Sequence, residues 1–157
     1  MAVNRGKAFE QKFLADFKAS FPNGTIDRIY DVTSGYKTLA NISDFIGYNK
    51  PLHMYLECKS TTGNTFPLTR LTQYSALKHK VGIPGVRAGV ILWFIDHDVI
   101  YYVPISSVTK MLEDEKKSIH VKWGESDDYY IVKIPAEKQR TYLTGDYSVL
   151  ANLPEGT

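Results

Sequence analysis

Residues 42–60 read ISDFIGYNKPLHMYLECKS, and the prediction of the fold rests on this stretch. Two runs in it, Ile42–Tyr48 and Leu52–Ser60, carry the apolar and aromatic residues typical of β-strands. The polar residues and proline between them favour a turn centred on Lys50-Pro51. The stretch therefore predicts two neighbouring antiparallel strands.

The predicted pairing places Asp44 opposite Glu57, provided that the register holds to within a residue. Side chains directly opposed on antiparallel strands have Cβ atoms about 4.5–5.5 Å apart, where two carboxylates repel each other. A divalent cation with oxygen ligands would remove that repulsion. The sequence thus predicts a metal site shared by two strands.

Lys59 lies on the same face of the second strand as Glu57, because side chains alternate along a strand. A lysine beside a metal-ligating carboxylate can orient or help deprotonate an attacking water, or balance the charge of a phosphate. The alternative is a strand whose polar face meets solvent, since the pattern E-x-K occurs by chance in many proteins. Cys58 alternates with the apolar residues and is predicted to be a buried small hydrophobe.

A helix is predicted from Asn4, as its N-cap, to about Ser20. At helical spacing one face of it is apolar, formed by Phe9, Phe13, Leu14, Phe17 and Phe21. Glu10 falls in the middle of that face. A carboxylate aimed at a core is costly unless it is paired or binds a cation. Glu10 is therefore a third acid of the metal site, the partner of a buried Arg or Lys, or a residue that a rotation of the helix frees from the core.

The remaining pattern predicts an α/β fold with a mixed sheet flanked by helices. A strand is expected at Thr25–Val32, a helix at Leu68–Val81, and a hairpin of two strands around Asp96-His97-Asp98. The later elements are a helix from Ser106 or Ser107 to about Lys117 and strands at Ile119–Trp123 and Tyr129–Ile134. The hairpin strands are Ala88–Ile95 and Val99–Ile105.

The composition is that of one ordinary globular domain, with 43% hydrophobic and 23% charged residues over 157 positions. We expect a single domain over residues 1–157, with a core at about 4–135 and a tail at about 141–157 that covers either a core edge or a partner. No apolar run reaches the roughly 18 residues of a membrane span. One cysteine suits a reducing compartment, so a cytoplasmic location in a bacterial or phage-infected cell is predicted.

The formal net charge of +2 permits a polyanionic partner without demanding one. Basic residues dominate the first forty positions, whereas residues 113–128 are rich in acids. Each basic residue alone is more often ordinary surface. As candidates for DNA backbone contacts we single out Arg5, Lys7, Arg28, Lys37, Arg70 and Lys78. Tyr36 and Tyr48 are candidates for stacking on bases, against the alternative of packing within the protein.

Asp44, followed thirteen residues later by Glu57-Cys58-Lys59, resembles the motif of the PD-(D/E)XK nuclease superfamily, with Ser43 in place of the proline. Within it, the opening Arg5–Glu10 segment and Phe66-Pro67-Leu68 resemble the RecU-type Holliday junction resolvases. Ser34-Gly35 and Glu57–Ser60 are also similar to the archaeal resolvase branch. The resemblance covers about residues 4–105.

This resemblance implies a restriction-endonuclease-like core and a Mg²⁺ or Mn²⁺ site. The ligands would be Asp44, Glu57, the Cys58 carbonyl and Glu10, and Lys59 would be the catalytic lysine. The resemblance further suggests roles for three polar residues. Gln73 would be the polar catalytic residue of the following helix, although it lies closer to Phe-Pro-Leu than is usual, and Ser34 and Thr62 would lie near DNA.

The implied reaction is hydrolysis of a DNA phosphodiester that leaves a 5′-phosphate, with a four-way junction as substrate in recombination or repair. Cutting two opposed strands calls for two symmetric sites, so a homodimer is expected. The segment between Glu10 and Asp44 is shorter than the usual stalk of such enzymes. The short segment puts strict junction selectivity in question. Two alternatives stay open: a nuclease of the same type acting on flaps, ends or duplex, and a catalytically inactive DNA-binding module.

Overall fold

The computed structural model describes residues 4–157 except 31, 35–36 and 40, and it describes no side chains within 31–40. The centre is a six-stranded sheet in the order β1-β4-β5-β7-β8-β10. Its strands are β1 (Thr25–Arg28), β4 (Phe45–Asn49), β5 (Leu52–Thr61), β7 (Val86–Phe94), β8 (Val99–Pro104) and β10 (Val132–Lys133). Only β5 and β7 are parallel among these neighbours. The predicted mixed sheet is confirmed.

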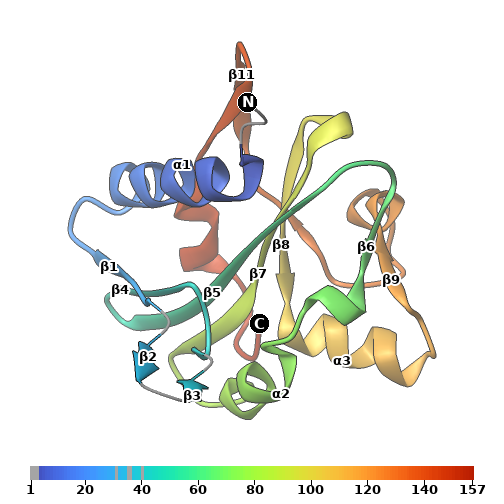
Figure 1. Ribbon diagram of the computed structural model, residues 1–157, viewed down its shortest axis with the longest axis horizontal. Coiled ribbons are helices and arrows are strands. Elements are labelled where there is room, and N and C mark those ends of the chain that lie inside the picture. The colour runs from blue at the N-terminus through green and yellow to red at the C-terminus, as the bar shows by residue number, and fades with distance from the viewer. Residues whose placement is uncertain (1–3, 31, 35–36, 40) are drawn as a thin grey trace.

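Helices and smaller ribbons surround this sheet (Figure 1). The α-helices are α1 (Arg5–Ser20), α2 (Tyr74–Leu77) and α3 (Ile105–Glu113). Three two-stranded ribbons pair β2 (Val32–Ser34) with β3 (Lys37–Leu39), β6 (Thr65–Pro67) with β9 (Ser118–His120), and β11 (Ala136–Gln139) with β12 (Tyr142–Gly145). Short 3₁₀ turns are η1 (Leu68–Arg70), η2 (Lys78–Lys80), η3 (Ile95–His97), η4 (Val121–Glu125) and η5 (Tyr147–Asn152).

The register of β4 and β5 sets the position of the predicted acids. Phe45 lies opposite Leu56, and the pairing runs to Asn49 opposite Leu52. One step before Phe45, this register brings Asp44 opposite Glu57. The predicted antiparallel pair and its register are confirmed.

The first helix begins and ends as its sequence predicts. The Asn4 side chain accepts a hydrogen bond of 3.2 Å from the Lys7 amide, which satisfies one of the free N–H groups at the helix start. At the other end, the Phe21 amide donates to the Phe17 carbonyl. The predicted apolar face packs on the sheet, with Phe9, Phe13, Phe17 and Phe21 buried.

Two hydrophobic clusters occupy the two faces of the sheet. One joins the apolar face of α1 to even-numbered residues of β5 such as Met54 and Leu56. The other joins α3 to residues of β7 and β8 such as Val90 and Val103. This layering leaves the odd-numbered residues of β5, including Glu57, on the side away from the α1 cluster.

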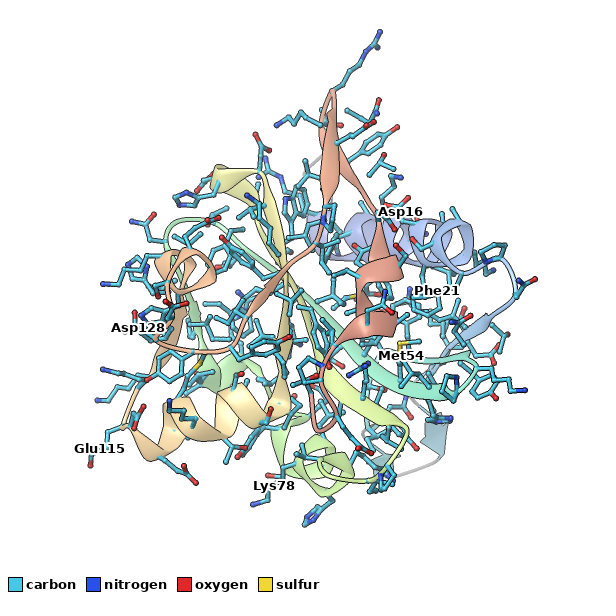
Figure 2. The ribbon with its side chains drawn as sticks, turned by 180° about the vertical axis from the view of Figure 1, so that it is seen from behind. Asp16, Phe21, Met54, Lys78, Glu115 and Asp128 are labelled. Atoms are coloured by element: carbon cyan, nitrogen blue, oxygen red, sulfur yellow. The ribbon has the colours of Figure 1, made fainter. Side chains whose placement is uncertain are left out.

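The C-terminal segment belongs to the α1 cluster. Leu143, Tyr147 and Leu150 are buried there, and Tyr147 meets the ring of Phe13 edge-on at 4.8 Å between centroids. The Gly145 amide also donates to the buried carboxylate of Asp16, where α1 meets β12 (Figure 2). Of the two roles left open for this segment, the structure shows that it covers a core edge.

The predicted helix at Leu68–Val81 is wrong, because the chain forms η1, α2 and η2 in its place. The segment is held at its start, where the Leu68 amide donates to the Lys117 carbonyl. Leu71 then leaves the helical region, with φ −90° and ψ 72°. This break lets Leu68, Leu71 and Leu77 all point inward, which one straight helix in this place does not achieve.

Later boundaries are shorter than predicted. Helix α3 ends at Glu113 rather than Lys117, since Glu115 adopts a left-handed conformation with φ 58°. The strand expected at Ile119–Trp123 turns into η4 after His120, and the one expected at Tyr129–Ile134 pairs only at Val132–Lys133. Over the described part of the chain, no helix is both long and apolar enough to span a bilayer.

Candidate active site

The carboxylates of Asp44 and Glu57 each accept a hydrogen bond from a backbone amide across the strand pair. The Asp44 amide donates to Glu57 Oε2 at 3.0 Å, and the Cys58 amide donates to Asp44 Oδ2 at 2.9 Å. Each carboxylate is thus oriented by an N–H group of the opposite strand. Glu57 is only 1% exposed. This reciprocal arrangement holds the two acids together, with Glu57 shielded from water and Asp44 half-buried.

Lys59 supplies the positive charge that the sequence predicts beside Glu57. Its Nζ lies 3.1 Å from Glu57 Oε1, and its side chain is 21% exposed. Glu57 therefore uses one oxygen for the Asp44 backbone and the other for the lysine. The partial exposure leaves the ammonium group within reach of a ligand.

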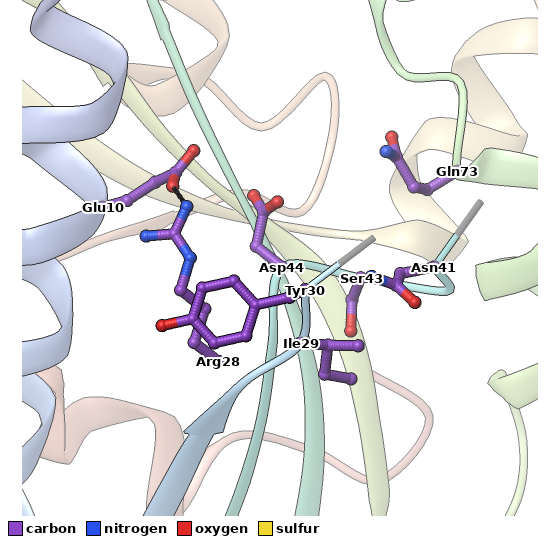
Figure 3. Close-up of a pocket in the computed structure, with 8 residues that line it drawn as sticks. All are labelled: Glu10, Arg28, Ile29, Tyr30, Asn41, Ser43, Asp44 and Gln73. Carbon is purple, nitrogen blue, oxygen red and sulfur yellow. Dashed lines mark hydrogen bonds and ion pairs between the residues drawn. The ribbon is translucent and has the colours of Figure 1, made fainter. Parts of the chain in front are cut away.

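Glu10 approaches this pair from α1, and it is held by Arg28. Arg28 Nη2 donates to Glu10 Oε2, as the dashed line in Figure 3 marks. The predicted pairing of Glu10 with an arginine is confirmed. Glu10 also faces the same space as Asp44, as its alternative role in a metal site requires (Figure 3). Arg28 comes from β1, beside β4, where it lies opposite Phe45.

A cavity of about 280 Å³ opens beside Glu10, Arg28 and Asp44, whereas Glu57 and Lys59 do not line it. It is lined by Glu10, Arg28, Ile29, Tyr30, Asn41, Ser43, Asp44 and Gln73. Gln73, at the start of α2, lies across the cavity from Glu10 (Figure 3). The break before α2 therefore still delivers the predicted glutamine to the site.

Sequence reasoning missed Tyr30 and Asn41 as cavity residues. Tyr30 is 73% exposed, and its ring lies 5.5 Å from the Arg28 guanidinium. The only signal for Tyr30 was an aromatic residue two positions after a basic one in a predicted strand. Nothing in the sequence pattern around Asn41 distinguishes it from an ordinary turn residue.

Burial and mutual repulsion dominate the electrostatics of the acids. Desolvation, and then the charge of Asp44, raise the pKa of Glu57 to about 7. Desolvation also raises the pKa of Asp44, and burial followed by the charge of Asp44 raises the pKa of Glu10. Burial raises the pKa of the Cys58 thiol as well, which agrees with a buried, unreactive cysteine. The protein on its own thus opposes full ionisation of the cluster.

The donor atoms suit a small divalent cation. Carboxylate oxygens are the ligands that Mg²⁺ prefers. The carboxylates of Asp44 and Glu57 lie close together, and a bound cation would neutralise their negative charge. Among the described residues, no three His, Cys, Asp or Glu side chains form a ready-made cluster. Glu10, which lines the cavity with Asp44, pairs with Arg28 instead. The residues fit a metal site in which Asp44 and Glu57 are in place and Glu10 is held by Arg28.

The other predicted DNA contacts do not gather in this cavity. Arg5 lines a separate groove between α1 and β12, and Lys78 lies over the Tyr74 ring. Arg70 donates to the Ser60 carbonyl and stacks on Phe66. Thr62 is exposed just past β5. Ser34 and Lys37 pair with each other through their backbones, whereas their side chains, like Tyr36, lie outside the described residues.

A mixed sheet with two facing acids and an E-x-K strand defines the protein as a PD-(D/E)XK nuclease of the restriction-endonuclease-like fold. The family model of RecU, recombination protein U, matches residues 5–145, and the chain belongs to this family. Comparison with curated proteins gives no match.

The fold also has a counterpart among solved structures. Hjc of Archaeoglobus fulgidus, a Holliday junction resolvase from an archaeal hyperthermophile, superposes with a TM-score of 0.53 and 18% identity. The match covers 73% of this chain and 88% of that one. The predicted resemblance to both the RecU-type and archaeal resolvases is confirmed at the level of family and fold.

Proposed function

We propose that this protein is a structure-selective, metal-dependent endonuclease that hydrolyses DNA phosphodiesters at four-way junctions during recombination or repair. Its membership of the recombination protein U family supports the substrate class. The observation that carries the chemistry is the reciprocal hold on Asp44 and Glu57, each by an amide of the opposite strand, with Lys59 alongside.

In this proposal Asp44, Glu57 and the Cys58 carbonyl hold Mg²⁺ or Mn²⁺, with Glu10 as a further ligand. The bound cation would lower the pKa of a water molecule and stabilise charge on the phosphoryl oxygens. The charge of Lys59 lowers the pKa of Glu57 against the larger effect of burial, and its ammonium group would hydrogen-bond the attacking water or a phosphate oxygen. Gln73 faces the cavity from the opposite side and would orient the same water or phosphate.

Residues 1–157 would act as one nuclease unit, and two copies would form a homodimer. A four-way junction is resolved by cutting two strands of the same polarity, which needs two sites related by twofold symmetry. Arg5, Lys7, Arg28, Ser34, Lys37, Thr62, Arg70 and Lys78 would contact the DNA backbone. Their spread over several elements suits a branched substrate larger than the cavity.

A second candidate is a nuclease of the same chemistry that acts on flaps, ends or duplex. The observation in its favour is the small ribbon between Arg28 and Asp44, whose strands β2 and β3 have three residues each. A ribbon of this size offers little surface to enter a junction centre.

The test compares cleavage of a synthetic four-way junction, a flap and a linear duplex in Mg²⁺ or Mn²⁺, with wild type and Asp44→Asn. We expect the wild type to cut the junction preferentially and the variant to bind it without cutting. Preference for the flap or duplex would favour the second candidate. Binding without cutting by both proteins would mean a catalytically inactive DNA-binding module.

A further inference from the structure

Glu10, the third candidate acid of the metal site, pairs with a cation. Glu10 accepts a hydrogen bond from Arg28, and the two side chains are only 18% and 28% exposed. Both line the cavity that also contains Asp44 (Figure 3). A charge pair in such a partly shielded place is stronger than one at the open surface. Glu10 is therefore committed to Arg28 in the protein without DNA.

Arg28 is held in position by its surroundings. It lies opposite Phe45 in the pairing of β1 with β4, and the Ile29 amide extends this pairing by donating to the Asp44 carbonyl. The guanidinium lies 5.8 Å from the Phe45 ring centroid and 5.5 Å from that of Tyr30. Arg28 thus has its stem fixed by the sheet and its head at the mouth of the cavity.

The pair can be broken by a substrate that offers a better partner. A guanidinium has five N–H donors in a planar fork that matches a phosphate, so a DNA phosphate in the cavity would compete with Glu10 for Arg28. A divalent cation held by Asp44 and Glu57 would compete with Arg28 for Glu10. Each exchange favours the other, because releasing Glu10 from Arg28 supplies the missing oxygen ligand.

We propose that Arg28 is a positioning residue that withholds Glu10 from the metal site until a DNA phosphate takes the guanidinium. The metal site is then completed only on the substrate, and metal and DNA strengthen each other's binding, as thermodynamic linkage requires. This proposal rests on the proposed nuclease function and adds a control to the same site.

The experiment measures the Kd of Mn²⁺ for the DNA-free protein by electron paramagnetic resonance or calorimetry. Four proteins form a cycle: wild type, Arg28→Gln, Glu10→Gln and the double variant. We expect Arg28→Gln to bind Mn²⁺ about tenfold more tightly than wild type, the size of effect that neighbours of metal ligands commonly have. In the Glu10→Gln background the same substitution should give no gain, because no carboxylate is released.

Lys12→Gln is the matched control. Lys12 is also on α1 and also pairs with an acid, Asp16, but neither residue lines the cavity. Its loss removes the same charge and should leave the Kd of Mn²⁺ within twofold of wild type. If Arg28→Gln does not fold, Arg28→Met keeps the apolar stem against Phe45, and the same gain is expected from it.

Two results would overturn the proposal. One is Mn²⁺ binding by the Arg28 variant that is no tighter than that of wild type. The other is an equal gain with and without Glu10, which would reduce the effect of Arg28 to charge alone. If wild type binds Mn²⁺ and cuts junctions in either case, the proposed function stands. If no protein in the cycle binds Mn²⁺ and wild type does not cut, both proposals fail.

Discussion

At the scale of single residues, the chemistry depends on what surrounds two facing carboxylates. Lys59 contacts Glu57 at 3.1 Å and is the cation that the site offers directly beside its acids. Arg28 pairs with Glu10, the third candidate ligand. The candidate acids are therefore paired with two cations of different kinds, a flexible ammonium and a fixed guanidinium.

Lys59→Met should reduce junction cleavage by at least about 100-fold, the usual loss when a group that assists proton transfer is removed. The Kd of Mn²⁺ should not rise, since the lysine is not a metal ligand. Rates under single-turnover conditions test this expectation. Lys133→Met is the control, because Lys133 pairs with Glu125 on the open surface and its loss should leave the rate unchanged. Cleavage by Lys59→Met at the wild-type rate would contradict the assigned role.

Glu57 should make the metal-free protein less stable as the pH rises. Its pKa in the folded protein is about 7, above the ordinary value of 4.5, so the folded state holds a proton that the unfolded state releases. The stabilisation of the folded protein by this bound proton is fully present below pH 4.5 and is lost as the pH rises through 7. Urea unfolding between pH 4.5 and 8 measures it.

Two comparisons sharpen this pH test. Glu57→Gln should flatten the decline, because the amide carries no proton to lose. Saturating Mg²⁺ should restore stability at pH 8, since a cation favours the ionised pair. A wild-type stability that rises steadily from pH 4.5 to 8 without metal would argue against the buried, mutually repelling acids.

Much of the site could be predicted from the sequence because its acids and lysine lie on two strands joined by a short turn. Period-two alternation put Glu57 and Lys59 on one face, and the turn set Asp44 opposite Glu57. The pairing of Glu10 with Arg28 spans eighteen positions between a helix and a strand. No local pattern specifies such a contact, and so the sequence left the partner of Glu10 open.

At the scale of elements, α1 and the C-terminal segment support each other and thereby the site. Helix α1 carries Glu10 on the same turns that bury Phe9 and Phe13, so the packing of its apolar face fixes the direction of the acid. Tyr147 and Leu150 of the C-terminal segment belong to the same hydrophobic cluster as Phe9 and Phe13. The C-terminal segment thus stabilises the helix that delivers the third acid.

Leu150→Ala should destabilise the protein by about 2–5 kcal/mol, since Leu150 is fully buried and the change leaves a cavity. Leu112→Ala on α3 is the matched control, because Leu112 is 41% exposed and should cost no more than about 0.5 kcal/mol. Chemical denaturation gives both values. Equal, small losses would mean that the C-terminal segment is not part of the folded core.

Element types were predictable where one period dominated, and they failed where burial required a bend. Helix α1 and strands β4 and β5 follow periods of about 3.6 or 2, and β7 and β8 are short, almost continuously buried apolar runs. The segment from Leu71 to Val81 has helical spacing, but the chain leaves the helical region at Leu71. This bend buries Leu68 together with Leu71 and Leu77, and a local pattern cannot foresee it because it depends on the rest of the core.

At the scale of the whole molecule, a junction resolvase needs two active sites on one substrate. We expect a homodimer in solution, measurable by light scattering after size-exclusion chromatography. Mixed dimers of wild type and Asp44→Asn should cut one strand and therefore convert a supercoiled cruciform plasmid to the nicked circle. Wild-type dimers should produce the linear form. Linear product from a protein that stays monomeric would contradict the paired-site account.

The most direct test of the account is where Mn²⁺ binds in a crystal of the protein, located by its anomalous scattering. We predict a peak within about 2.5 Å of carboxylate oxygens from both Asp44 and Glu57, as for a hard cation with oxygen ligands. A peak elsewhere, or none between these two side chains in crystals of protein that cuts DNA, would contradict the account.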